Sequence, residues 1–166
     1  MFESILCQVT EYNPDVLESL IELAVEIARE GREGRRVGTL FTLGDETAVL
    51  ARSRPLILDP LSGHPESSLH VTNLNLDAVA AQVDVPLELG SRHIAAANMS
   101  AVTKAVGIVV SESSVVRLFC HGQLVGEIIP EVWMMDHAQL GGAVKREQVG
   151  ELTILTPSLR PAPITK

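Results

Sequence analysis

The sequence has few cysteines, and those it has do not form a recognisable pattern. Its 166 residues include Cys7 and Cys120, which lie far apart and show no CxxC or Cys/His spacing. We therefore expect neither a disulfide framework nor a zinc site. Both cysteines are interpreted as small buried hydrophobic residues in a reducing compartment.

The chain also lacks an excess of positive charge. Its formal net charge is -8 at pH 7, whereas a nucleic-acid-binding domain usually carries a basic patch or stripe. Arginines gather between residues 29 and 36, but glutamates are interleaved with them, which is typical of a solvated surface. The composition therefore predicts no nucleic-acid partner.

Long apolar runs are missing as well. No stretch approaches the ~20 apolar residues that span a bilayer, and the N-terminus lacks the basic region and apolar core of a signal peptide. We expect no membrane partner and a cytoplasmic location. With 46% hydrophobic residues, the chain can still bury a core as one domain.

Helical and strand patterns alternate along the chain, which predicts the α/β class. Asn13 is a typical helix cap and Gly31 a typical helix end, with apolar residues at helical spacing between them. Another helix is expected over residues 94–106, and a short one over 46–53. Strands are expected at 37–43, 106–110, 115–120, 123–129 and 152–155, with a hairpin turn at His121-Gly122.

The run Leu89-Gly90-Ser91-Arg92-His93 opens the alanine-rich helix. Backbone N–H groups at a helix start, with a cation and an imidazole beside them, can bind phosphate. On spacing alone, Arg92 could instead cap the helix or pair with an acid, and His93 could be a core histidine.

A second polar cluster follows an apolar strand. Val109-Val110 is followed directly by Ser111-Glu112, which places hydroxyl groups and one carboxylate at the strand end. This carboxylate is either a metal ligand or a solvated strand-end residue. Together with the phosphate site, the cluster indicates nucleotide chemistry.

In this order, three stretches resemble the diadenylate cyclase (DAC) domain family, especially its archaeal-type branch. They are residues 26–45, the run 89–93, and residues 109–113 ahead of the hairpin. The resemblance implies a mixed central β-sheet wrapped by helices. It also implies that two ATP molecules are condensed into cyclic di-AMP with Mn²⁺ or Mg²⁺, by two domains facing each other as a homo-oligomer.

Individual roles follow from the same resemblance. Gly90, Ser91, Arg92 and His93 match the phosphate-binding motif, whose third basic position is Ile94 here. Ser111 and Glu112 match the Ser-Glu pair, in which the carboxylate is a metal ligand. Gly38 and Thr39 match the strand that lines the adenine.

The chain departs from the family at one catalytic motif. No Asp-Gly-Ala sequence occurs, although its Asp is a metal ligand and activates the attacking hydroxyl in the family. One helix–hairpin unit is therefore expected to be missing, and Asp77 is only a weak candidate replacement. A metal held by Glu112 alone would bind weakly.

Two functions follow from these observations. The chain is predicted to be a diadenylate cyclase domain over residues 1–130 with an extension and tail over 131–166. The alternative is a catalytically degenerate module that binds ATP or cyclic di-AMP, or that regulates a partner by dimerisation.

Overall fold

The computed structural model describes residues 2–31, 35–52, 89–130, 138–140 and 144–158. The helices in these ranges are α1 (Glu3–Leu6), α2 (Pro14–Glu30), α3 (Glu46–Arg52) and α5 (Ser91–Val102). The strands are β1 (Thr39–Leu43), β2 (Val106–Val110), β3 (Val116–Cys120), β4 (Gln123–Ile129), β5 (Val144–Val149) and β6 (Leu152–Pro157). None of the described helices is long and apolar enough to cross a bilayer.

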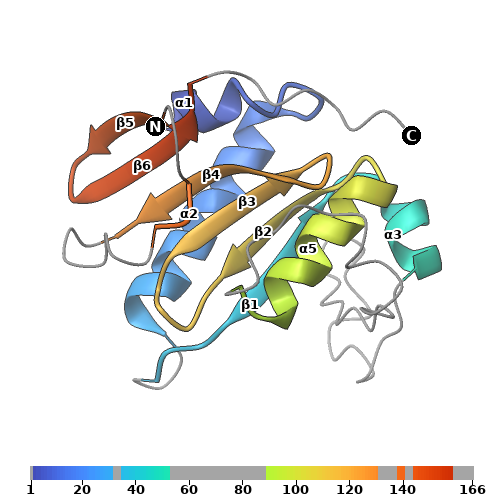
Figure 1. Ribbon diagram of the computed structural model, residues 1–166, viewed down its shortest axis with the longest axis horizontal. Coiled ribbons are helices and arrows are strands. Elements are labelled where there is room, and N and C mark those ends of the chain that lie inside the picture. Colours follow the sequence, from blue (N-terminus) through green and yellow to red (C-terminus); the bar gives the residue numbers. More distant parts are fainter. Residues whose placement is uncertain (1, 32–34, 53–88, 131–137, 141–143, 159–166) are drawn as a thin grey trace.

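The six described strands form one sheet in the order β1-β2-β3-β4-β6-β5 (Figure 1). This confirms the α/β class with a central sheet. The sheet was expected to be mixed, but every described strand pair is antiparallel. The short connections explain much of this, since a tight turn such as His121-Gly122 can join only antiparallel neighbours. Both turn residues have positive φ, at 53° and 78°, as a two-residue hairpin turn of this hand requires.

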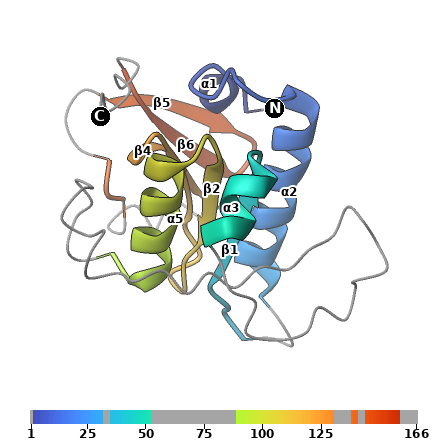
Figure 2. The same cartoon turned by 90° about the vertical axis from the view of Figure 1, so that its right-hand side faces the viewer.

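Helices cover both faces of the sheet, with α2 on one face and α5 on the other (Figure 2). The sheet has an apolar core on each face, and neighbouring residues of β2 belong to different cores. Ile108 packs with Leu17 and Ile21 of α2, whereas Val109 packs with Ala96 of α5. Because successive strand residues point to opposite faces, a strand covered on both sides is apolar throughout.

The ends of α2 follow from its sequence. The Asn13 side chain accepts a hydrogen bond from the N–H of Asp15 at 2.9 Å, and Pro14 occupies the first turn, where it costs no backbone bond. Gly31 ends the helix with φ of 67°, a conformation that favours glycine. The prediction for this helix is confirmed at both ends.

Helix α5 lies unusually close to β2. A β-carbon added to Gly107 would lie 2.8 Å from that of Ala96 and 3.1 Å from the Ala96 backbone. Small side chains on both elements allow this approach. The close packing fixes the N-terminus of α5 relative to the end of β2, where the polar cluster begins.

The C-terminal part differs most from expectation. Residues 152–155 were predicted to form an edge strand, but β6 is an inner strand that pairs with both β4 and β5. β5 forms the edge of the described sheet beside β6, and it was not predicted. Two strands of the predicted extension 131–166 therefore continue the sheet of residues 1–130.

Candidate functional site

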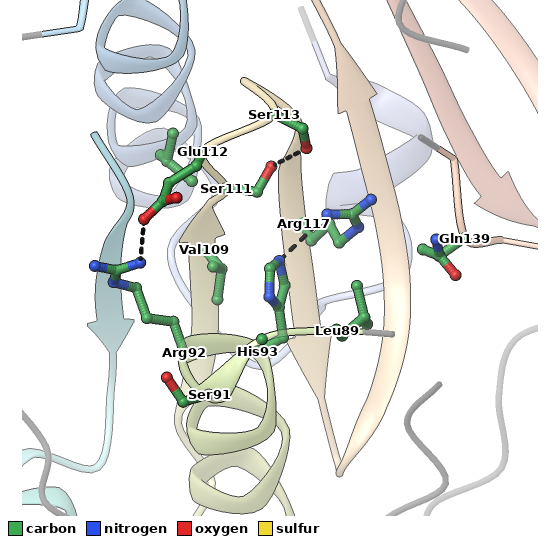
Figure 3. Close-up of a pocket in the computed structure, with 12 residues that line it drawn as sticks. Leu89, Ser91, Arg92, His93, Val109, Ser111, Glu112, Ser113, Arg117 and Gln139 are labelled. Atoms are coloured by element: carbon green, nitrogen blue, oxygen red, sulfur yellow. Dashed lines mark hydrogen bonds and ion pairs between the residues drawn. The ribbon is translucent and has the colours of Figure 1, made fainter. Parts of the chain in front are cut away.

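A pocket of about 430 Å³ lies where α5 begins and β2 ends (Figure 3). It brings together the two polar runs that the sequence separates by about twenty residues. Its lining residues are Leu89, Gly90, Ser91, Arg92, His93, Val109, Val110, Ser111, Glu112, Ser113, Arg117 and Gln139.

One wall of the pocket is the N-terminus of α5. The helix begins at Ser91 with Gly90 as its N-cap, and no side chain of the described residues caps it. The N–H of His93 bonds to the Gly90 carbonyl at 3.0 Å, but the first N–H groups of a helix have no intrahelical acceptor. They present positive charge density to the pocket.

Arg92 and Glu112 form an ion pair at the pocket mouth. Arg92 Nη1 donates to Glu112 Oε1 at 3.4 Å, and the two side chains are 49% and 74% exposed. Gly38, just ahead of β1, gives the guanidinium room, because a β-carbon there would lie 2.4 Å from Arg92 Nη1. Ligand contacts were predicted for all three residues from the sequence, and in the structure the three residues lie side by side.

The Ser111 hydroxyl holds the turn after β2. It donates to the Val115 carbonyl at 3.0 Å and accepts from the Val115 N–H at 3.1 Å. Since a hydroxyl has one proton, the 2.7 Å contact with Ser113 requires the Ser113 hydroxyl to donate. Ser111 therefore shapes this wall, and the Ser113 hydroxyl oxygen keeps free lone pairs.

His93 is buried in the opposite wall and is neutral at pH 7. The pKa of its imidazole is lowered from 6.5 to about 4, chiefly by burial and then by the positive charges of Arg117 and Arg92, while the nearby Gly90 backbone opposes the fall. Arg117 Nη1 lies 3.2 Å from His93 Nε2. Because a guanidinium only donates, Nε2 must accept and the proton lies on Nδ1. That N–H has no hydrogen-bond acceptor among the described residues.

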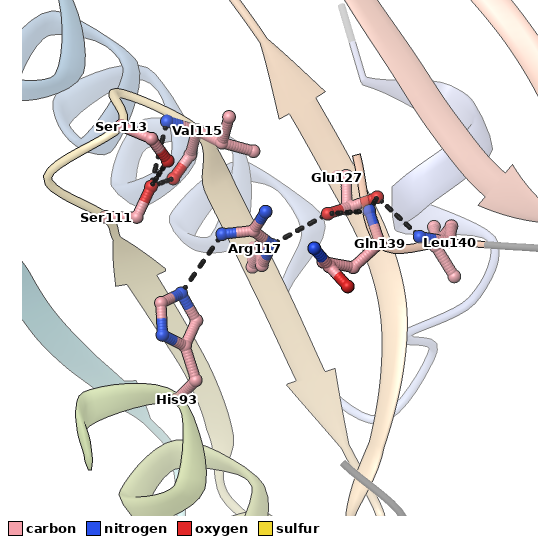
Figure 4. A network of polar contacts seen from close by, with 8 residues as sticks. All are labelled: His93, Ser111, Ser113, Val115, Arg117, Glu127, Gln139 and Leu140. Carbon is pink, nitrogen blue, oxygen red and sulfur yellow. Dashed lines mark hydrogen bonds and ion pairs between the residues drawn. The ribbon is translucent and has the colours of Figure 1, made fainter. Parts of the chain in front are cut away.

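Arg117 continues this contact into a buried network (Figure 4). Its Nε donates to Glu127 Oε1 at 2.7 Å, and the two side chains are 3% and 0% exposed. Glu127 also accepts backbone N–H bonds from Gln139, at 2.8 and 3.0 Å, and from Leu140, at 2.7 Å. The network links α5, β3 and β4 to residues 138–140.

Comparison with known proteins shows which sequences this chain is similar to. The DAC family model, described as DisA bacterial checkpoint controller nucleotide-binding, matches residues 64–124. A protein of Methanocaldococcus jannaschii named "Diadenylate cyclase" is 37% identical over 141 residues, covering 69% of this chain and 45% of that protein. This chain belongs to the DAC family. A protein of the same name from Haloferax volcanii is 31% identical over 148 residues, covering 73% of this chain and 55% of that protein.

This DAC chain thus spans about half the length of the curated relatives it matches. The first match extends over 141 positions, whereas 69% of 166 residues is about 115, so part of the matched relative has no counterpart here. No solved structure matches the chain.

Three of the predicted site residues of the DAC chain, Gly38, Thr39 and Asp77, are not among the residues that line the described pocket. Thr39 pairs with Val110 at the end of β2, so it lies beside the pocket but does not line it. Asp77, the weak catalytic candidate, lies outside the described residues, as does the stretch where the missing helix–hairpin unit was predicted.

The described part of the DAC pocket does not fit a metal held by protein ligands alone. Its lining includes a single carboxylate, Glu112, which is paired with Arg92. Within the described ranges, no three His, Cys, Asp or Glu side chains lie close enough together to hold a metal ion. Mg²⁺ and Mn²⁺ generally need several oxygen ligands, so the described lining alone would not hold either ion.

Three residues of the site and its supporting network were not predicted from the sequence: Arg117, Glu127 and Gln139. A signal was present for the first two, because each is a charged residue inside an otherwise apolar strand of the predicted hairpin. The two residues face each other across the hairpin. No comparable pattern marks Gln139 in the sequence, because its position depends on contacts with residues that are distant along the chain.

Proposed function

We propose that this DAC domain binds the phosphates of ATP or cyclic di-AMP in the pocket at the start of α5. The observation that carries this proposal is the convergence of Ser91, Arg92 and the free α5 N–H groups on one pocket. Helix N-termini and guanidinium groups both favour anions, and they do so most effectively together. A pocket of about 430 Å³ is also within the usual size range of small-ligand sites.

His93 would contribute as a neutral donor in this site. Its Nδ1–H is the group left without an acceptor, and a ligand oxygen in the pocket could accept that hydrogen bond. A cationic role on the phosphates does not fit its lowered pKa. Arg92 would then supply the positive charge, by turning from Glu112 to the ligand.

We further propose that condensation of two ATP molecules into cyclic di-AMP is much slower here than in the relatives. The resemblance assigns a metal ligand and the activation of the attacking hydroxyl to the Asp of Asp-Gly-Ala, and the sequence has no such motif. The unmatched positions in the longer relative support a deletion. The chain would then act as a binding or regulatory member of the family, in a face-to-face pair with an active or identical copy.

The first experiment measures ATP binding and turnover on the same preparation. Purified protein would be incubated with ATP and Mn²⁺ or Mg²⁺, and cyclic di-AMP would be sought by mass spectrometry. The Arg92→Ala, Glu112→Ala double variant serves as the blank and the Methanocaldococcus relative as the positive control. Calorimetric titration with ATP gives the affinity.

We expect ATP binding with product near the blank. Product at the level of the relative would contradict the second proposal and would show that another carboxylate, such as Asp77 or Asp84, replaces the missing Asp. A folded protein that binds neither ATP nor cyclic di-AMP would contradict the first proposal. It would leave dimerisation as the function.

A further inference from the structure

The segment 138–140 contributes Gln139 to the pocket lining and lies outside the stretch matched by the family. Ala138 and Leu140 pack against an apolar cluster that includes Val115 and Ile129. The side chain between them, Gln139, lines the pocket. Both of its neighbours are anchored, so the direction of Gln139 is fixed by packing on either side.

Glu127 fixes the backbone of the same segment. Its carboxylate accepts N–H bonds from both Gln139 and Leu140, at 2.7 to 3.0 Å. The carboxylate is itself held by Arg117 at 2.7 Å and is fully buried. Hydrogen bonds from two consecutive amides to one buried carboxylate are short and directional. They leave the segment little freedom to turn Gln139 away.

Charge is distributed unevenly across the pocket. Figure 3 shows Arg92 on one side and Gln139 on the other, with His93 and Arg117 between them. The Arg92 side has the helix N-terminus and an exposed guanidinium. On the Gln139 side, the charge of Arg117 is balanced by Glu127, and His93 is neutral.

A nucleotide has the same asymmetry, with anionic phosphates at one end and a neutral base at the other. We propose that Gln139 contacts the base of the bound adenine nucleotide and that Glu127 is the positioning residue that holds it there. A carboxamide offers one donor and one acceptor, which match the N6 amino group and a ring nitrogen of adenine. This assignment rests on the proposed function of the pocket. It places the base on the side away from Gly38, which lies against Arg92, and so differs from the expectation that the strand of Gly38 and Thr39 lines the adenine.

Two probes separate the ends of the pocket: ATP, and inorganic tripolyphosphate, which has the phosphates but no base. Calorimetric titrations would compare wild type with Gln139→Ala, Arg92→Ala and the control Gln148→Ala. Gln148 lies on β5, is not among the pocket-lining residues, and bonds to the Gly150 carbonyl.

We expect Gln139→Ala to weaken ATP binding about three- to tenfold, the range of one or two lost neutral hydrogen bonds. Its affinity for tripolyphosphate should stay at the wild-type value. Arg92→Ala should weaken both probes, and Gln148→Ala neither. Glu127→Gln should reproduce the selective loss for ATP, because the released segment no longer presents Gln139.

Several results would overturn the assignment. Unchanged ATP affinity in Gln139→Ala would show that no base contact exists, and an equal loss for both probes would place Gln139 on the phosphates. If Glu127→Gln fails to fold, as circular dichroism would reveal, Gln139→Ala alone decides. A wild-type protein that binds neither probe would refute the proposed function itself, which is a distinguishable outcome.

Discussion

Two Arg–Glu pairs lie at the same pocket, and they differ in nearly every physical respect. Arg92 and Glu112 meet at 3.4 Å with about half or more of each side chain exposed. Arg117 and Glu127 meet at 2.7 Å and are almost completely buried. The first pair remains largely hydrated. The second pair is shielded from water, so its hydrogen bonds are formed within the protein.

The difference indicates which pair can respond to a ligand. An exposed ion pair contributes little free energy, so Arg92 can leave Glu112 for a phosphate at small cost. A buried pair cannot separate without leaving an uncompensated charge. The pocket therefore has one wall that can rearrange and one that stays in place.

The largest expected effect comes from breaking the buried pair. Glu127→Leu removes the carboxylate and leaves Arg117 buried without its partner, so the free energy of unfolding should fall by about 3–5 kcal/mol. Glu112→Ala, which breaks the exposed pair, should cost less than about 1 kcal/mol. Urea unfolding followed by circular dichroism measures both values.

A double variant sharpens this test. Arg117→Met with Glu127→Leu removes both charges, so it should recover much of the stability lost in Glu127→Leu. A double variant as unstable as the single one would show that the bonds to residues 138–140, and not the unpaired charge, account for the loss.

The second expected effect is a dependence of stability on pH through His93. Its folded pKa of about 4 lies below the ordinary value of 6.5, so the unfolded chain takes up the proton first. The free energy of unfolding should therefore be undiminished above about pH 6.5 and fall by up to about 3 kcal/mol as the pH drops to about 4. Urea unfolding of wild type and His93→Gln at several pH values measures the share due to His93.

His121 provides the matched control, because its side chain is 37% exposed and contacts Glu11 rather than Arg117 or Glu127. His121→Gln should retain the pH dependence of wild type. If His93→Gln also shows the wild-type pH dependence, the buried imidazole is not the cause of the loss of stability at low pH.

A third effect concerns binding and should leave stability almost unchanged. Arg92→Ala should weaken ATP binding by more than about 1 kcal/mol, because a charge-assisted hydrogen bond to phosphate is lost. Arg29→Ala breaks a comparable surface pair, with Glu151 at 3.1 Å, away from the pocket. It should leave ATP affinity unchanged. Equal affinity of wild type and Arg92→Ala would remove Arg92 from the site.

The smallest effect should come from Gly38. An added methyl group would meet the flexible end of Arg92 rather than backbone, so Gly38→Ala should displace the guanidinium with little loss of stability. ATP affinity should fall by less than in Arg92→Ala. Because both changes act on one group, the double variant should bind no more weakly than Arg92→Ala alone. Additive losses would contradict this coupling.

Much of the framework could be predicted because local signals agreed with the fold. Asn13 and Gly31 bound α2 as expected, and the His121-Gly122 turn fixed the β3–β4 hairpin. The polar runs at 89–93 and 109–113 were recognised as neighbours through the order of the motifs. In the structure they line one pocket.

The remainder depends on contacts that no local pattern encodes. β5 is an edge strand with charged residues along it, and such strands lack the apolar alternation that marks buried ones. The neutral state of His93 depends on burial and on Arg117, which is distant in sequence. Gln139 lines the pocket because Glu127 binds its backbone and because Ala138 and Leu140 are packed on either side of it.

The strand order has a consequence for how this chain is made. β6, the last of the described strands along the chain, pairs directly with β4, and the fully buried Ile128 and Ile129 lie on β4. During vectorial synthesis, β4 emerges from the ribosome well before its neighbour. An unpaired strand edge rich in isoleucine is prone to pair with other chains. This edge of β4 is covered only when β6 has been made and pairs with it.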